Sequence, residues 1–175
     1  MISDVIRTVL VVLTIIAQAL IVLALIAYAT KRWNNHARRS VSFCRRRAAP
    51  LAFIVALTSF LGSMSLSQIL GWQPCTLCWY QRIAMFPQAI ILGSALMTRE
   101  KKWHLSTAAL SIIGILISGY HWATQMLEAN VPCSASGPSC AARYIFSTSY
   151  ITIPFMAMCA FTLILLISIN ARARS

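Results

Sequence analysis

Five long apolar stretches limit what this chain can fold into more than any other feature of its sequence. They run over residues 5–29, 48–70, 79–98, 105–127 and 151–170. Each has about the 20 residues that a helix needs to cross a hydrocarbon layer about 30 Å thick. With 59% of its residues hydrophobic and only 10% charged, the chain has more apolar surface than one soluble domain could bury. The sequence therefore predicts an all-α polytopic membrane protein, a small bundle of transmembrane helices.

The first apolar stretch does not have the pattern of a secretory signal. Its apolar run is long, it has no small-residue cleavage site, and it ends at Lys31 and Arg32. We therefore expect residues 5–29 to remain in the protein as a transmembrane helix.

The positive charge of the chain is concentrated in three segments outside the apolar stretches. The formal net charge is +12, and twelve of the fifteen Lys and Arg residues lie in these segments: Lys31, Arg32, Arg38, Arg39, Arg45, Arg46, Arg47, Arg99, Lys101, Lys102, Arg172 and Arg174. By the positive-inside rule these segments face the cytoplasm, so we expect a multi-pass cell-membrane protein with its N-terminus outside and its C-terminus cytoplasmic. The charge thus indicates topology rather than a nucleic-acid partner, although the first basic loop also suits contact with anionic membrane lipid.

Four of the six cysteines fall in segments that are predicted to face the periplasm or the exterior. Cys75 and Cys78 lie where a short loop enters the third apolar stretch, and Cys133 and Cys140 lie in the longer loop that follows the fourth. Disulfides persist outside the cytoplasm, whereas thiols are kept reduced inside it. This placement favours an exported redox chemistry.

The pair Cys75-Thr76-Leu77-Cys78 is a C-x-x-C motif at the predicted start of a helix. Backbone N–H groups and the helix dipole stabilise a thiolate there. The membrane surface also gives access to a soluble partner on one side and to a lipid-soluble acceptor, such as a quinone, on the other. Structural disulfides and halves of zinc sites share this spacing, so a tetrahedral zinc site built from four cysteines stays an alternative, although we expect no metal.

Cys133 and Cys140 are separated by a segment rich in serine, glycine and proline, which predicts an exposed, mobile loop rather than a membrane helix. Mobility suits thiol–disulfide exchange, because a carrier pair must reach two partners in turn. A static disulfide that closes the loop is the alternative, but it leaves Cys75 and Cys78 on the same face unexplained.

Arg82 and His121 are the other candidate site residues. Arg82 follows Cys78 by four residues, so it lies on the same helix face one turn deeper. There its charge would stabilise the Cys78 thiolate and a reduced quinone oxygen, unless it extends to lipid headgroups instead. His121 lies near the outer end of the fourth stretch, where it would hydrogen-bond a quinone carbonyl or exchange its protons, or else pack in an interfacial aromatic cluster.

Residues 75–83 (CTLCWYQRI), followed by residues 85–87 (MFP), closely resemble the signature of the DsbB/BdbC family of membrane disulfide-generating proteins. This match is much more specific than C-x-x-C alone. Residues 119–122 (GYHW), 132–133 (PC), 139–140 (SC) and 151–155 (ITIPF) are also similar to that family, and to its BdbC-like members most. The resemblance covers roughly residues 50–170.

The resemblance implies a four-helix transmembrane bundle over residues 48–175 with redox-active outer loops, preceded by a transmembrane helix and a basic cytoplasmic loop over residues 1–47. It also implies a protein disulfide:quinone oxidoreductase. Cys133 and Cys140 would oxidise a DsbA-like thioredoxin-fold protein, and Cys75 and Cys78 would pass the electrons to membrane quinone, either ubiquinone or menaquinone. Because one chain carries all four cysteines, we expect a monomer to be functional.

By the same resemblance, Arg82 and His121 would bind the quinone. The chain departs from the family in its extra helix over residues 5–29 and in the short spacing between Cys133 and Cys140, which leaves open which loop cysteine meets the partner. A vitamin K epoxide reductase-like enzyme is a second possibility, but there the quinone-side C-x-x-C follows the loop pair, and here it precedes it. A non-catalytic membrane subunit is a third, and its four outer cysteines would form structural disulfides or a metal clasp that do not cycle.

Overall fold

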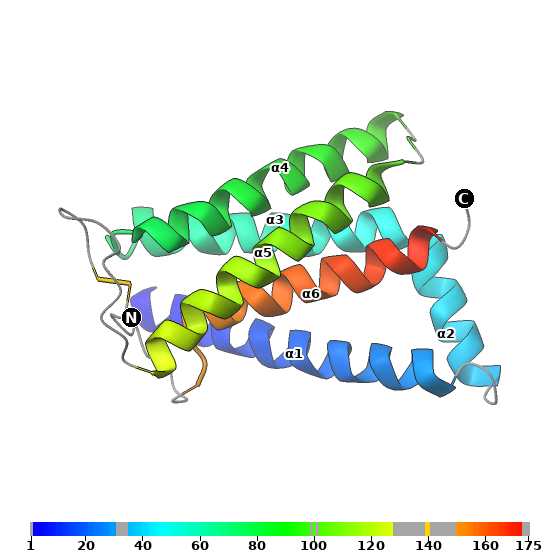
Figure 1. Ribbon diagram of the computed structural model, residues 1–175, viewed down its shortest axis with the longest axis horizontal. Coiled ribbons are helices and arrows are strands. Elements are labelled where there is room, and N and C mark those ends of the chain that lie inside the picture. The colour runs from blue at the N-terminus through cyan, green and yellow to red at the C-terminus, as the bar shows by residue number, and fades with distance from the viewer. Residues whose placement is uncertain are drawn as a thin grey trace.

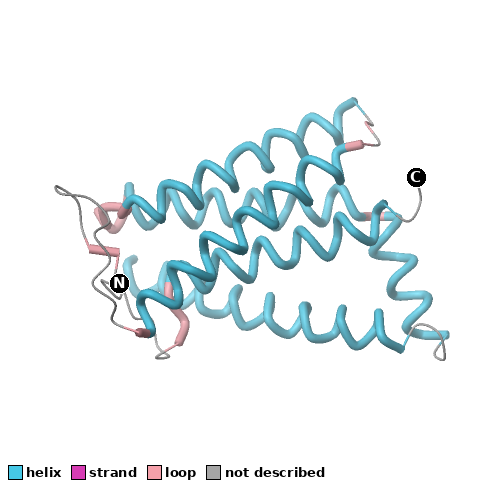
Figure 2. Tube along the Cα trace, in the orientation of Figure 1, coloured by secondary structure: helices cyan, strands magenta, loops and turns pink. Residues whose placement is uncertain are grey.

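The computed structural model describes residues 2–30, 35–98, 100, 102–127, 139–140 and 150–172. These residues form six α-helices and no strand: α1 (Ile2–Thr30), α2 (Asn35–Arg46), α3 (Ala48–Gln68), α4 (Thr76–Thr98), α5 (Trp103–Met126) and α6 (Ile153–Arg172). Helices make up nearly all of the described chain (Figure 2). The predicted all-α class is confirmed.

The five long helices correspond to the five predicted apolar stretches, and α2 is the exception. Residues 35–46 were expected to be part of a loop, and that expectation is wrong. The segment contains four arginines, which favour helix, and neither proline nor glycine. Its side chains are mostly exposed, so local propensity rather than burial accounts for this helix.

Four of the described helices are long and apolar enough to cross a membrane: Ser3–Thr30 of α1, Ala48–Gln68 of α3, Trp103–Met126 of α5 and Ile153–Ala171 of α6. The expected span over residues 79–98 corresponds to α4, which is not among these four. Gln81, Arg82 and Gln88 make α4 more polar than its neighbours. Its 23 residues nevertheless give it a length of about 35 Å, enough to run beside the others through the same layer.

Helices α3, α4, α5 and α6 form the bundle, and α1 lies beside α6 at its edge (Figure 1). α5 packs against α4 and α6, and α3 also packs against both of these helices. Ala48, Ala52 and Ala56 recur every fourth residue on the buried face of α3, so the helices approach one another closely. Leu92 and Phe161 are fully buried in the same core.

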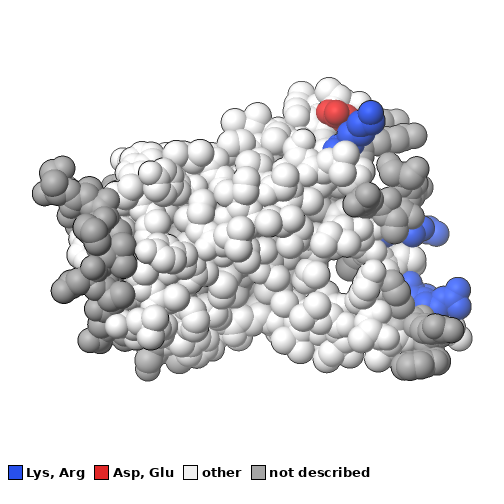
Figure 3. All heavy atoms as spheres, viewed as in Figure 1, with Lys and Arg blue, Asp and Glu red and all other residues white. Residues whose placement is uncertain are grey.

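The two ends of the bundle differ in composition. At one end lie the N-terminus, the α3–α4 connection and residues 139–140; at the other lie α2, the α4–α5 connection and the last turn of α6 (Figure 1). Figure 3 shows Lys and Arg side chains at the second end and none along the side that faces the viewer. We call these the cysteine end and the basic end. Among the described residues, Cys75, Cys78 and Cys140 lie at the end opposite the basic segments, as predicted. The cytoplasmic location of the basic end stays a prediction.

Candidate redox site

The connection between α3 and α4 places Cys75 at the start of a helix. Gly71 has a φ of +68°, a conformation that glycine adopts without steric cost, and the N–H of Trp72 donates to the carbonyl of Leu66 at 3.1 Å. The carbonyl of Cys75 then accepts a hydrogen bond from the N–H of Trp79, also at 3.1 Å. Cys75 therefore caps the N-terminus of α4, where the helix dipole favours a thiolate.

Cys75 and Cys78 are free cysteines whose Sγ atoms lie 3.3 Å apart. The Cys78 thiol donates a hydrogen bond to Cys75, and this bond is the main reason why the pKa of Cys75 falls well below its usual value. Burial of Cys75 opposes the shift, and His121, whose Nε2 lies 3.7 Å from the Cys75 sulfur, adds to it. Of the two thiols, Cys75 therefore forms a thiolate more readily.

Two hydrogen bonds hold the ring of His121, which is only 1% exposed. Its Nε2 lies 3.1 Å from the main-chain carbonyl oxygen of Cys140, and a carbonyl can only accept, so Nε2 carries the hydrogen. Its Nδ1 lies 3.0 Å from Nε2 of Gln81, which donates to it in the neutral imidazole. Gln81 and the Cys140 carbonyl thus set the orientation and tautomer of the ring, with its N–H beside the Cys75 sulfur.

The interfacial aromatic cluster that was the alternative role for His121 does form, but without His121. The ring of Phe155 packs against the ring of Trp122, with 5.8 Å between centroids, and against the ring of Tyr150, with 5.5 Å between centroids. Trp122 also donates to the carbonyl of Tyr150 at 3.3 Å. His121 instead faces the interior of the bundle, beside the C-x-x-C pair.

Cys140 is disulfide-bonded and only 1% exposed. Its Sγ atom, the Sγ atom of Cys75 and a ring nitrogen of His121 lie within 4.8 Å of one another. Three such atoms are close enough to share a metal ion, but a disulfide sulfur is not a thiolate ligand, so this oxidation state suits exchange rather than zinc. Cys133 and the rest of the predicted loop between residues 128 and 138 lie outside the described residues.

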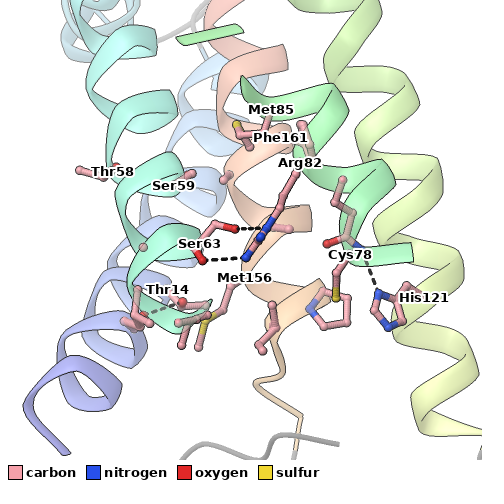
Figure 4. A pocket seen from close by; sticks show the side chains of 18 of the residues that line it. Thr14, Thr58, Ser59, Ser63, Cys78, Arg82, Met85, His121, Met156 and Phe161 are labelled. Atoms are coloured by element: carbon pink, nitrogen blue, oxygen red, sulfur yellow. Dashed lines mark hydrogen bonds between the residues drawn. The ribbon is translucent and has the colours of Figure 1, made fainter. Parts of the chain in front are cut away.

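Arg82 extends from α4 towards α3 and does not reach for lipid headgroups (Figure 4). Its Nε donates to Oγ of Ser63 and one Nη donates to the carbonyl of Ser63, each at 2.9 Å, and the same Nη donates to Oγ of Ser67. The guanidinium also lies 5.3 Å from the ring centroid of Trp79. Neutral oxygens rather than a carboxylate make these contacts, so the positive charge is not neutralised by them.

Ser63, Ser67 and the link between Gln81 and His121 were not foreseen from the sequence. The available signal was the four-residue spacing of the two serines near the end of a predicted helix, which puts them on one face. The sequence does not say which helix that face meets. Gln81 directly precedes Arg82 in the sequence, yet its side chain bonds to His121 on α5 while Arg82 bonds to α3.

A cavity of about 310 Å³ opens inside the bundle next to these residues. Cys75, Cys78, Arg82 and His121 all line it, at the cysteine end (Figure 4). Towards the middle of the bundle its walls are largely apolar side chains of α1, α3 and α6. The structure therefore brings five of the six predicted site residues around one partly apolar space: Cys75, Cys78, Arg82, His121 and Cys140.

The comparisons with known proteins agree with this geometry. The family described as "Disulfide bond formation protein DsbB" matches residues 45–171 of the chain. "Disulfide bond formation protein C" of Bacillus subtilis is 44% identical over 121 residues, which are 66% of this chain and 85% of that protein. The "SPbeta prophage-derived disulfide bond formation protein B" of the same species is 34% identical over 115 residues, 65% of this chain and 78% of that protein. No solved structure matches significantly.

The match to the family includes every side chain of the redox site, from Ser63 on α3 to Cys140 near α6, and leaves out only α1 and most of α2 among the described helices. A bundle of apolar helices, a thiolate-stabilising C-x-x-C pair and a nearby disulfide are thus found in one matched segment. The chain belongs to the DsbB family of disulfide bond formation proteins.

Proposed function

We propose that this membrane protein oxidises the dithiol of a DsbA-like thioredoxin-fold protein at the cysteine end and passes the two electrons to membrane quinone. The observation that carries the proposal is the distance between the two redox pairs. The free Cys75 and the disulfide-bonded Cys140 have their Sγ atoms within 4.8 Å, next to the cavity that Cys78 and Arg82 line. Thiol–disulfide exchange needs such an approach, because a thiolate must attack a disulfide sulfur directly.

The burial of Cys140 suggests how the loop cysteines divide the work. Since Cys140 lies against Cys75 and His121, we assign to it the exchange with the C-x-x-C pair, and to Cys133 the exchange with the partner. A partner thiolate attacks Cys133, the proposed Cys133–Cys140 bond breaks, and Cys140 leaves as a thiolate. The second partner thiolate then attacks the mixed disulfide, so the partner is oxidised and both loop cysteines are reduced.

The electrons next move to the C-x-x-C pair. The Cys140 thiolate attacks Cys75 of an oxidised Cys75–Cys78 disulfide, and Cys78 leaves as a thiolate beside Arg82. Cys133 then attacks Cys140, which restores the loop disulfide and releases Cys75. The products are a disulfide-bonded Cys140 with free Cys75 and Cys78, which is the combination that the structure contains.

The cavity fits a quinone as the final acceptor. Its volume of about 310 Å³ lies at the lower end of the range for small-molecule sites, and its walls combine apolar side chains with the Arg82 cation and the His121 N–H. A bound quinone would supply a two-electron, two-proton acceptor for the Cys75–Cys78 dithiol. Arg82 would stabilise negative charge on Cys78 and on a ring oxygen, and His121 would hold a proton beside Cys75.

Quinone absorbance in a stopped-flow instrument tests the reaction, with purified protein and a reduced thioredoxin-fold donor. We expect the wild type to reduce quinone, and single serine variants at Cys75, Cys78, Cys133 and Cys140 to lose turnover with the protein donor. A Cys159→Ser variant is the control, because Cys159 is buried in α6 away from the site. A wild type that leaves every ubiquinone and menaquinone analogue unchanged would rule out the quinone oxidase and favour the non-catalytic subunit.

A trapping experiment tests the order of exchange separately. A variant with Cys78→Ser and Cys133→Ser keeps Cys75 and Cys140, and mild oxidation should join these two in a disulfide that peptide mass spectrometry detects. The matched variant with Cys75→Ser and Cys133→Ser keeps Cys78 and should form the corresponding bond far more slowly. Equal trapping in both variants would contradict the assignment of Cys75 as the exchanging residue.

A further inference from the structure

α1 needs a structural explanation, because it lies outside the segment that matches the family. A helix that served only as an anchor would face lipid all round. Much of α1 does face lipid: Val5, Val9, Val12 and Leu23 are each at least 48% exposed. The opposite side of α1 packs against the bundle instead.

One stripe of α1 faces the interior of the bundle. Thr14 is only 5% exposed, and the side chain of Leu10 packs against Gly62 of α3, where an added Cβ would lie 3.0 Å from Leu10 Cδ2. Leu10, Thr14 and Ala17 recur at intervals of three and four residues, which puts them on one helix face. These residues, with Leu13, line the same cavity as Cys78 and Arg82. Figure 4 shows Thr14 in this lining.

The start of α1 is also attached to the loop that leads to Cys75. The guanidinium of Arg7 lies 5.3 Å from the ring centroid of Trp72, a cation–π contact. Trp72 itself lines the cavity. α1 is therefore held at the cysteine end by the contact of Arg7 with Trp72 and of Leu10 with Gly62, and it also packs against α6.

We propose that α1 is the wall of the acceptor pocket that recognises the apolar chain of the quinone, an inference that rests on the function proposed above. The guanidinium of Arg82 and the imidazole of His121 lie at the cysteine end, so the oxygen-bearing ring belongs there. The first part of the chain then runs against Leu10, Leu13 and Ala17. Since a cavity of about 310 Å³ is too small for a ring with a long polyprenyl chain, the remainder leaves the pocket for the bilayer.

The test compares two quinones with the same ring, one with a decyl chain and one without a chain. The ring is the type that the wild type reduces. Ala17→Trp fills the pocket where the chain is placed. It should raise KM for the decyl quinone about tenfold or more, since each methylene in an apolar pocket is worth about tenfold, and should change KM for the chainless quinone much less. Leu23→Trp is the matched control, because Leu23 is 61% exposed on the lipid-facing side of the same helix.

Two further measurements keep the test decisive. Leu13→Trp is a second variant for the case that Ala17→Trp does not fold, because Leu13 lines the pocket but is 43% exposed and leaves room for the larger ring. Without quinone, exchange between the partner dithiol and the loop disulfide should proceed equally in all variants. If the wild type reduces neither quinone, the proposed function fails. If it reduces both and the pocket variants behave like Leu23→Trp, the function stands and the role of α1 is refuted.

Discussion

The half of the bundle near the basic end and the half near the cysteine end are built differently. In the first, Ala52, Ala56, Leu92 and Ile164 are all 0% exposed, and the hydrogen bonds between Thr107 and Ser168 and from Ser111 to Gln88 are buried as well. In the second, a cavity of about 310 Å³ opens, and polar side chains hydrogen-bond to one another across three helices. The difference shows that close packing in one half supplies the stability that an open pocket in the other half does not. Changes at the cysteine end should therefore alter chemistry before they alter folding, and changes in the packed half should do the reverse.

The largest effect should come from the sulfur atom at the centre of the exchange. Cys75→Ser removes the sulfur that Cys140 attacks, so turnover with the protein donor should fall at least about a thousandfold, as for other residues that act as one catalytic unit. The thermal unfolding midpoint in detergent should change little. A large drop in that midpoint would mean that the cysteine end also carries the fold, and the contrast between the halves would not hold.

Arg82→Gln should have the next largest effect. The variant loses the cation beside Cys78 but keeps a side chain that can bond to Ser63, so we expect kcat/KM for quinone to fall by about 100-fold, the usual loss for one electrostatic donor. Arg82→Lys keeps the charge but loses the planar guanidinium that contacts Ser63 and Ser67. Its kcat/KM for quinone should lie between those of the wild type and Arg82→Gln. Equal rates for the glutamine and lysine variants would argue that position rather than charge matters.

Near the middle of the bundle, where Phe161 also lines the cavity, Gly114→Ala should lower stability more than it lowers activity. An added Cβ would lie 2.4 Å from ring carbons of Phe161, which is fully buried, so the helices must move apart. We expect a loss of about 1–3 kcal/mol in the free energy of unfolding, typical of an overfilled core. Gly119→Ala on the same helix is the control, since its Cβ would meet only Met158 Sδ at 3.9 Å. If both variants unfold alike, the close contact is not what stabilises this part of the bundle.

The smallest effect concerns the acidity of Cys75. Its pKa is lowered, so its thiolate persists at more acidic pH than that of an ordinary cysteine. Removing a donor should raise that pKa, and Cys78→Ala should raise it more than Gln81→Leu, because the bond from Cys78 is the main cause and Gln81 acts only through His121. Titration of the ultraviolet thiolate absorbance, with Cys75→Ser subtracted, measures both shifts. The reverse ranking would make the imidazole the main cause.

The sequence predicted the helices and the main site residues for different reasons. Apolar runs of about 20 residues identify membrane helices because the bilayer leaves little choice of structure, and the bounds of α3 and α5 differ from the predictions by two residues or fewer. Cys78 and Arg82 could be placed together because both lie on one helix face. The bonds from Arg82 to Ser63 and from Gln81 to His121 join separate helices, and their existence depends on helix rotation, which no spacing in the sequence determines.

The bond from His121 to the backbone of Cys140 affects how substitutions at this position are to be interpreted. The acceptor is a main-chain carbonyl, which every amino acid provides. Cys140→Ser or Cys140→Ala therefore removes the sulfur and leaves the anchor of the imidazole in place. Evolution can likewise vary the side chains around this point without losing the orientation of the ring. Activity lost on substitution of Cys140 thus reports on the loss of its sulfur and disulfide, not on the loss of an acceptor for the imidazole of His121.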